Sequence, residues 1–173
     1  MNLFDLTGKI ALVTGGAHSI GFAIGKALAQ AGATVCFNCT SEGSRARGEE
    51  NYAADGITAY GYVANVTSEE EMNALVARIR EEHGIIDILV NNAGIIKRIP
   101  MLEMSVEDFR QVVDVDLNAP FICAEQALAG TNQGNLLYSP MPPEKMGVLQ
   151  AKSASPQIGN NGRSPILNTD LKM

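Results

Sequence analysis

A regular alternation of strand-like and helix-like segments, between residues 9 and about 128, constrains the fold of this chain more than any other feature. Strand-like patterns are expected at 9–13, 33–37, 58–63 and 86–90, and helix-like patterns at 20–31, 44–54, 68–79 and 105–124. The stretch 86–90 is almost continuously apolar, as strands covered on both faces are. The alternation predicts βαβ units, and therefore an α/β fold with a Rossmann-type doubly wound parallel sheet.

The alternation stops near residue 128. Residues 129–173 hold five of the seven prolines of the chain, and they are rich in the turn-forming residues Gly, Asn and Ser. Because no hydrophobic periodicity persists there, we expect a domain of residues 1–128 followed by an irregular or divergent tail, 129–173. The sheet is therefore expected to be incomplete on its C-terminal side.

Composition and charge narrow the class of protein. The chain has 173 residues, of which 46% are apolar and 18% charged, as in one globular domain. Its net charge of −6 argues against nucleic-acid and anionic-membrane partners. Apolar runs are too short to span a bilayer, and residues 1–9 lack a secretory pattern. The three cysteines lack metal-ligand spacing, so we expect no metal site and reduced thiols in a cytoplasmic protein.

The stretch 14–21, Thr-Gly-Gly-Ala-His-Ser-Ile-Gly, follows a predicted strand and opens a predicted helix. A dinucleotide pyrophosphate binds in this context, because the amides and the dipole at the start of the helix favour an anion. Glycines let the phosphates approach the backbone. The alternative interpretation is a tight turn that needs a positive φ angle at Gly15 or Gly16.

The spacing Thr-Gly-x-x-x-Gly-x-Gly at 14–21 resembles the short-chain dehydrogenase/reductase family, with Ser19 in the place of the middle glycine. The segment Asn91-Asn92-Ala93-Gly94 after the strand 86–90 is a second match. The resemblance covers about residues 1–128, and the stretches 86–104 and 107–121 are similar to gluconate 5-dehydrogenase-like, sugar-acid members.

The resemblance implies a nicotinamide dinucleotide bound by a Rossmann domain of residues 1–128. The residues implied as cofactor-binding are Thr14, Gly15, His18, Ser19, Ile20, Gly21, Cys39, Thr40, Ser41, Asn65, Val66, Asn92, Ala93 and Gly94. An asparagine of the segment 91–94 would tie neighbouring strands together, and the amide oxygen of Asn65 would accept a bond from the adenine amino group.

The end of the second predicted strand bears on the choice between NAD and NADP. An acidic residue there bonds the ribose hydroxyls and repels a 2′-phosphate. The aligned residue is Cys39, and Arg45 and Arg47 lie within reach, so the sequence favours NADP(H). NAD remains the alternative, because Glu42 could turn toward the ribose.

The segment 114–121, Asp-Val-Asp-Leu-Asn-Ala-Pro-Phe, matches the family's catalytic-asparagine segment and implies a catalytic role for Asn118. Pro120 has no N–H to donate and should kink the helix. Lys97 and Arg98 are candidates to bind a substrate carboxylate, with a solvated basic pair as the alternative.

The family's reaction is hydride transfer at a secondary alcohol or ketone, here of a sugar acid or polyol, with a Tyr-x-x-x-Lys pair moving the proton. That pattern occurs nowhere in the sequence, and the tail lacks the helix that would carry it. Truncation, a frame change or a rearrangement would each produce such a join. The sequence therefore predicts an NAD(P)-dependent oxidoreductase of this family, with a catalytically incomplete nucleotide-binding or interaction module as the alternative. The family's dimer interface along the long helix implies a homo-oligomer.

Overall fold

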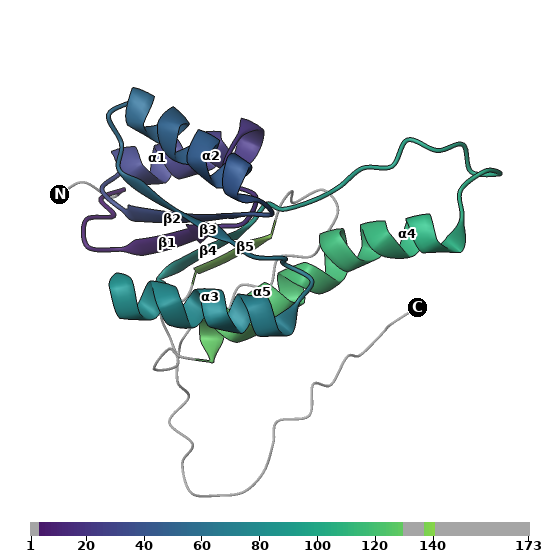
Figure 1. Ribbon diagram of the computed structural model, residues 1–173. Helices are drawn as coiled ribbons and strands as arrows, with labels where there is room; N and C mark the ends of the chain where they lie inside the picture. The colour runs from purple at the N-terminus through teal and green to yellow at the C-terminus, as the bar shows by residue number, and fades with distance from the viewer. Residues whose placement is uncertain (1–3, 130–136, 141–173) are drawn as a thin grey trace, which may run out of the picture.

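The computed structural model describes residues 4–129 and the backbone of 137–140. In this part of the chain, one parallel sheet has the strand order β3-β2-β1-β4-β5 (Figure 1). The strands are β1 (Ile10–Val13), β2 (Thr34–Cys39), β3 (Ala59–Val63), β4 (Ile88–Asn91) and β5 (Leu137–Pro140). The predicted Rossmann-type parallel sheet is confirmed.

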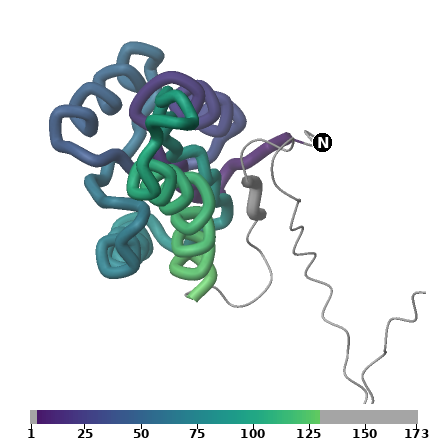
Figure 2. The backbone as a smooth tube through the Cα atoms, turned by 90° about the vertical axis from the view of Figure 1, so that its right-hand side faces the viewer, coloured from purple at the N-terminus to yellow at the C-terminus, as the bar shows by residue number. Residues whose placement is uncertain are grey.

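Helices cover both faces of the sheet (Figures 1 and 2). They are α1 (Ser19–Gln30), α2 (Glu42–Ala54), α3 (Glu69–Glu82), α4 (Val106–Val113), the π-helix η1 (Asp114–Asn118) and α5 (Ala119–Leu128). In Figure 1, α1 and α2 lie above the sheet and α3 and α5 below it. The core is accordingly divided, with one buried cluster on the side of α3 and α5 and two on the side of α1 and α2.

The strand order places the switch point of the sheet between β1 and β4. Chain connections run outward from β1 to β2 and β3 on one side, and β4 and β5 lie on the other side. Loops that leave the carboxyl ends of the two strands at such a point diverge, and an open α/β sheet binds its ligands in the crevice between them. The loops after β1 and β4 contain the two segments, 14–21 and 91–94, that the sequence singles out.

Three helices begin at a serine whose hydroxyl accepts a bond from the first turn: Ser41 for α2, Ser68 for α3 and Ser105 for α4. The predicted capping box of α4 is complete, because the Asp108 carboxylate also accepts from the backbone N–H of Ser105. At α3 the reciprocal bond is missing. The Glu71 carboxylate there accepts from the backbone N–H of Asn65 instead, which fixes the loop after β3.

The long helix predicted at 105–124 consists of α4, η1 and α5 in succession. The wide π turn of η1 ends directly before Ala119 and Pro120 at the start of α5. Proline cannot donate to the carbonyl one turn earlier, so a change in the hydrogen-bond pattern at this point has a local cause. Figure 1 shows α4 and the preceding loop extending well beyond the sheet.

β5 lies within the segment that the sequence predicts to be irregular. It pairs in parallel with β4, with Ile88 opposite Leu137 and Asn91 opposite Pro140. Four residues with no periodic pattern thus form a strand because a neighbouring strand offers free backbone groups. The rest of the predicted tail lies outside the described residues.

Candidate functional site

Two of the predicted segments meet at the switch point of the sheet. The turn 14–21 leaves β1, and the segment Asn92-Ala93-Gly94 leaves β4 beside it. Contact between them is so close that a Cβ atom on Gly15 would lie 3.1 Å from the Ala93 Cα atom. Gly15 also has a φ of 63°, a conformation that glycine adopts without steric cost.

Thr14 and Asn92 hold this junction together. The Thr14 hydroxyl, almost fully buried, accepts bonds of 3.0 Å from the backbone N–H groups of Asn92 and Ala93. The Asn92 side chain donates to the Thr14 carbonyl at 2.9 Å and to the Gly15 carbonyl at 3.1 Å. Asn92 thus ties the β1 and β4 loops to each other.

Two residues that the sequence did not single out hold the other side of the turn. The buried Asn38 side chain, on β2, accepts from the Gly15 N–H at 3.1 Å and donates to the Ala64 carbonyl at 2.6 Å. Tyr52, on α2, donates its hydroxyl to the Gly16 carbonyl at 3.1 Å, and burial raises its pKa to about 12. The available signal for Asn38 was a polar residue inside an otherwise apolar strand.

The start of α1 is the part of the turn that fits an anion. No side chain caps α1, and its first turn holds no acidic residue. By contrast, α2, α3 and α4 each have a serine cap and at least one acidic residue in the first turn. The amides at the start of α1 therefore have neither a capping oxygen nor a competing carboxylate, as a pyrophosphate site requires.

His18, Ser19 and Ile20 lie exposed at this helix start. Ser19 has a φ of 53°, so the serine adopts the left-handed backbone conformation that suits a glycine. Its hydroxyl lies 3.2 Å from the His18 ring nitrogen Nδ1. Gly21 is buried, and a Cβ atom there would lie 2.4 Å from the Gly15 carbonyl oxygen, so this position excludes a side chain.

The predicted adenosine-binding residues lie at the ends of β2 and β3. Cys39 is buried and its thiol donates to the Ser41 carbonyl at 3.4 Å. Burial raises the pKa of that thiol. Thr40 is exposed, and the Ser41 hydroxyl caps α2.

Asn65 and Val66 follow β3, and Val66 is buried. The amide oxygen of Asn65 accepts from the backbone N–H and the hydroxyl of Thr67, at 3.1 Å and 2.9 Å. The oxygen that the family resemblance implies for the adenine amino group is thus already engaged within the loop.

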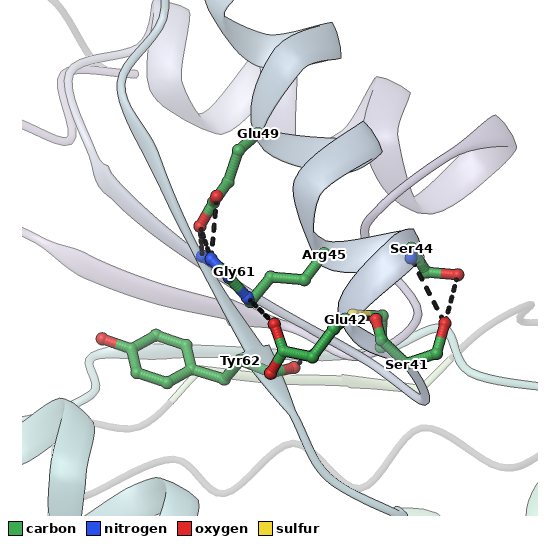
Figure 3. Close-up of polar contacts among 8 residues, drawn as sticks. Ser41, Glu42, Ser44, Arg45, Glu49, Gly61 and Tyr62 are labelled. Atoms are coloured by element: carbon green, nitrogen blue, oxygen red, sulfur yellow. Dashed lines mark hydrogen bonds and ion pairs between the residues drawn. The ribbon is translucent and has the colours of Figure 1, made fainter.

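Arg45 is held by two carboxylates of its own helix (Figure 3). Its Nε donates to Glu42 at 2.6 Å, and its Nη1 donates to the two oxygens of Glu49 at 3.0 Å and 2.9 Å. Both interactions raise the pKa of the guanidinium, the hydrogen bond to Glu42 most.

In η1, Asn118 and Asp116 have different surroundings. Asn118, the predicted catalytic residue, is exposed, and its side chain donates to the Asp114 carboxylate at 2.8 Å. Asp116 points toward the β4 loop, where its carboxylate accepts from the backbone N–H of Ile95 at 2.9 Å. It also lies next to Gly94. Asp116 is therefore the η1 side chain in contact with the Asn-Ala-Gly segment, and sequence reasoning passed over it although it lies two residues before Asn118.

Of the two candidate carboxylate-binding residues, Lys97 is engaged elsewhere. Its ammonium group donates to Asp108 at 2.6 Å and to the Gln111 side chain. The hydrogen bond from Lys97 and a second one from Ser105 lower the pKa of Asp108 to about 2. Arg98 is exposed on the loop.

In the part of the chain that the structure describes, no three His, Cys, Asp or Glu side chains are grouped as metal ligands. The three cysteines are free and buried. None of the helices in the described ranges has both the length and the apolar character needed to cross a membrane.

A doubly wound parallel sheet, with an uncapped helix start at its switch point, is the Rossmann-type architecture, in which open α/β sheets bind ligands at that point. The sequence profile of the short chain dehydrogenase family matches residues 9–136, which extends past the boundary predicted at residue 128. The chain belongs to this family.

Similar proteins include sugar-acid dehydrogenases. The chain is 50% identical to 2-dehydro-3-deoxy-D-gluconate 5-dehydrogenase of Formosa agariphila over 129 residues, which cover 74% of the chain and 49% of that protein. Its identity to gluconate 5-dehydrogenase of Gluconobacter oxydans is 37%, over 72% of the chain and 48% of that protein. The crystal structure of 2-keto-3-deoxy-D-gluconate dehydrogenase from Streptococcus agalactiae has a TM-score of 0.67 at 54% identity, covering 73% of the chain and 48% of that structure. The chain spans about half the length of the curated relatives it matches.

Proposed function

We propose that this chain carries the cofactor-binding part of an NAD(P)-dependent oxidoreductase that acts on a secondary alcohol or ketone of a sugar acid or polyol. When bound, the nicotinamide supplies hydride transfer. The residues of this chain bind the dinucleotide and orient it at the carboxyl ends of β1 and β4.

The observation that carries the proposal is the uncapped start of α1. It lacks both a capping side chain and a first-turn carboxylate, while Asn38 and Asn92 fix the preceding turn from β2 and from the β4 loop. Amides that are held in place and have no side-chain cap favour a pyrophosphate over a purely structural role for the turn. The proposed contacts are those of Gly15, Ser19, Ile20 and Gly21 with the phosphates, and of Ala93 and Gly94 with the nicotinamide half.

The proposed substrate class rests on the similar proteins, of which two in different organisms are named for oxidation at a gluconate-type carbon chain. A substrate carboxylate needs a basic partner. Lys97 is paired with Asp108. We therefore propose that the exposed Arg98 alone, and not Lys97 and Arg98 together, binds the substrate carboxylate.

The proton transfer has no candidate in this sequence, since Tyr-x-x-x-Lys is absent. This observation favours the second candidate function, a nucleotide-binding or interaction module without turnover. We propose Asn118 only as a member of the family's catalytic-asparagine segment, because its side chain is bonded to Asp114.

For the cofactor, two observations point in opposite directions. The absence of a carboxylate at Cys39 supports NADP(H), as the sequence favours. The pairing of Arg45 with Glu42 and Glu49 opposes it.

We further propose a homo-oligomer formed through the exposed helix α4–α5. We also propose a cytoplasmic location, which the three free thiols support.

Thermal unfolding of the complete chain with NADH and NADPH tests the proposal. Ligand at 100 times its dissociation constant should stabilise the fold by about 2.7 kcal/mol. No stabilisation at millimolar concentrations of either nucleotide would overturn it. An assay with gluconate-type acids and both oxidised cofactors separates the two candidates, because turnover supports the dehydrogenase and binding without turnover supports the module.

A further inference from the structure

We propose that Glu42 and Glu49 set the cofactor preference of this chain by holding Arg45 against the edge strand β3, so that the site selects an unphosphorylated adenosine ribose. The preferred cofactor is then NAD rather than NADP. The inference rests on the proposed function, because it concerns the same dinucleotide site, and it names the residues that discriminate between the two cofactors.

Arg45 lies one turn into α2, next to the edge strand β3 (Figure 3). Gly61 of that strand is opposite Phe37 of β2, which is two residues before the strand end at Cys39. The Arg45 side chain therefore lies beside Gly61, and its guanidinium is bonded there to Glu42 and Glu49.

Gly61 shows that the strand accommodates this arrangement. A Cβ atom on Gly61 would lie 2.6 Å from the Arg45 Cγ atom, so the missing side chain gives the arginine room to cross the strand. The backbone N–H of Gly61 donates to Glu49 at 3.2 Å and anchors the carboxylate that holds Arg45. Strand, arginine and carboxylate thus form one connected cluster rather than a chance surface ion pair.

The positive charge of Arg45 is already matched by two carboxylates. Three donor contacts of the guanidinium are directed to Glu42 and Glu49, and the two carboxylates together exceed its single positive charge. A 2′-phosphate would have to displace at least one carboxylate before it could bind Arg45. Arg47 does not replace it, because two residues along a helix lie about 200° apart around the axis.

The test compares ADP-ribose with its 2′-phosphorylated form, which differ only in the group that matters. Isothermal titration of the complete chain gives the two dissociation constants and their ratio. Wild type should bind ADP-ribose more tightly. In E42Q/E49Q the ratio should shift by about tenfold or more toward the 2′-phosphate form, because Arg45 becomes available for a charge-assisted bond. Glutamine at position 49 keeps an acceptor for the Gly61 N–H.

Two controls isolate the mechanism. The E50Q/E81Q variant removes the same charge from exposed positions of α2 and α3, and its ratio should equal that of wild type. The triple variant E42Q/E49Q/R45A should return the ratio to the wild-type value, since the gain depends on Arg45.

Four results would overturn the inference: tighter binding of the 2′-phosphate form by wild type, no shift of the ratio in E42Q/E49Q, an equal shift in E42Q/E49Q and E50Q/E81Q, or a shift that survives R45A. If no folded variant binds either nucleotide, the proposed function falls together with the inference. Binding without the expected change in ratio removes the inference alone.

Discussion

At the scale of single residues, the turn after β1 depends on backbone conformations and on two amide side chains. Ser19 adopts a φ of 53°, and Gly21 leaves no space for a side chain. The Asn38 and Asn92 side chains complete the hydrogen bonds of the turn. Adding or removing a single small side chain at these positions should therefore change the free energy of unfolding measurably.

Ser19→Gly should stabilise the protein. A non-glycine residue in the left-handed region costs about 1–2 kcal/mol, and glycine avoids this cost. Glycine also raises the conformational entropy of the unfolded chain, which cancels part of the gain in stability. We expect the free energy of unfolding in urea to rise by about 0.5–1 kcal/mol. The control S44G replaces a serine inside α2 and should lower it, so a loss of stability in both variants would contradict the strain at Ser19.

Gly21→Ala and Gly43→Ala should have opposite effects. The new Cβ atom at position 21 would lie 2.4 Å from the Gly15 carbonyl oxygen, and the backbone must move, at a cost of about 1–3 kcal/mol. At position 43, in α2, nothing lies within 4 Å, and alanine should stabilise the helix by about 0.5 kcal/mol. Equal effects of the two substitutions on the unfolding midpoint would contradict the close contact at Gly21.

The sequence predicted these local features unequally. The turn at 14–21 and its partner segment 91–94 could be located because each follows an apolar strand directly. Asn38 and Tyr52 could not be assigned to the turn, because their bonds to Gly15 and Gly16 join residues 23 and 36 positions apart along the chain. Pairing over such distances depends on strand register, which no local pattern encodes.

At the scale of elements, the helix that runs through α4, η1 and α5 positions two groups of side chains. The first half of the loop between β4 and α4 is attached to this helix at two points, through Ile95 to Asp116 and through Lys97 to Asp108. The sequence predicted the capping box and one helix, but not the π turn, since that depends on how the chain accommodates Pro120. β5 was missed because pairing with β4, not its own composition, makes it a strand.

Asp116→Ala should weaken binding of the dinucleotide but not of 5′-AMP. It removes the acceptor for the Ile95 N–H and frees the Gly94 segment, which lies under the proposed nicotinamide half. Loss of one hydrogen bond of about 1 kcal/mol corresponds to roughly fivefold weaker binding of NADH by titration. D116N retains an acceptor oxygen and should bind as wild type, and D114N should have no effect, because Asp114 contacts Asn118 instead. Equal weakening of 5′-AMP would contradict a positioning role.

The ion pair at the start of α4 should make stability depend on pH in acid. The pKa of Asp108 falls from 3.8 to about 2 in the folded state, so the folded form binds fewer protons than the unfolded form between these values. The contribution is fully present above the unfolded pKa and is lost as the pH falls toward the folded one. Denaturant unfolding at several pH values checks this: D108N should be less stable than wild type at pH 7, and the difference should close near pH 2. A constant difference would exclude the ion pair as its source.

At the scale of the whole molecule, the described part of the fold leaves one helix partly without cover. Phe109 is 59% exposed, Leu117 54% and Phe121 69%, along α4, η1 and α5. Figure 1 shows α4 extending beyond the layers that cover the sheet, and in Figure 2 the same end of the molecule faces the viewer. Apolar side chains on such an element favour association, as the family resemblance implies for the long helix.

The variant F109S/F121S should reduce self-association of the chain. Sedimentation velocity over a range of protein concentrations should give a larger mass for wild type than for the variant, because contact between apolar side chains drives the association. V63S, at an exposed apolar position of β3 on the other edge of the described sheet, is the control and should behave as wild type. A wild-type protein that remains monomeric at every concentration would contradict this interface.

The order in which the described residues build the β1 turn has a consequence for synthesis on the ribosome. Four residues that precede α4 supply most of its side-chain hydrogen bonds to the rest of the fold: Thr14, Asn38, Tyr52 and Asn92. A nascent chain can therefore complete the turn before α4 and α5 have left the exit tunnel, in the N-terminal-first sequence typical of domain folding. A dinucleotide captured at that stage would act as a template that selects the correct arrangement of β1, β2 and β4 while translation continues.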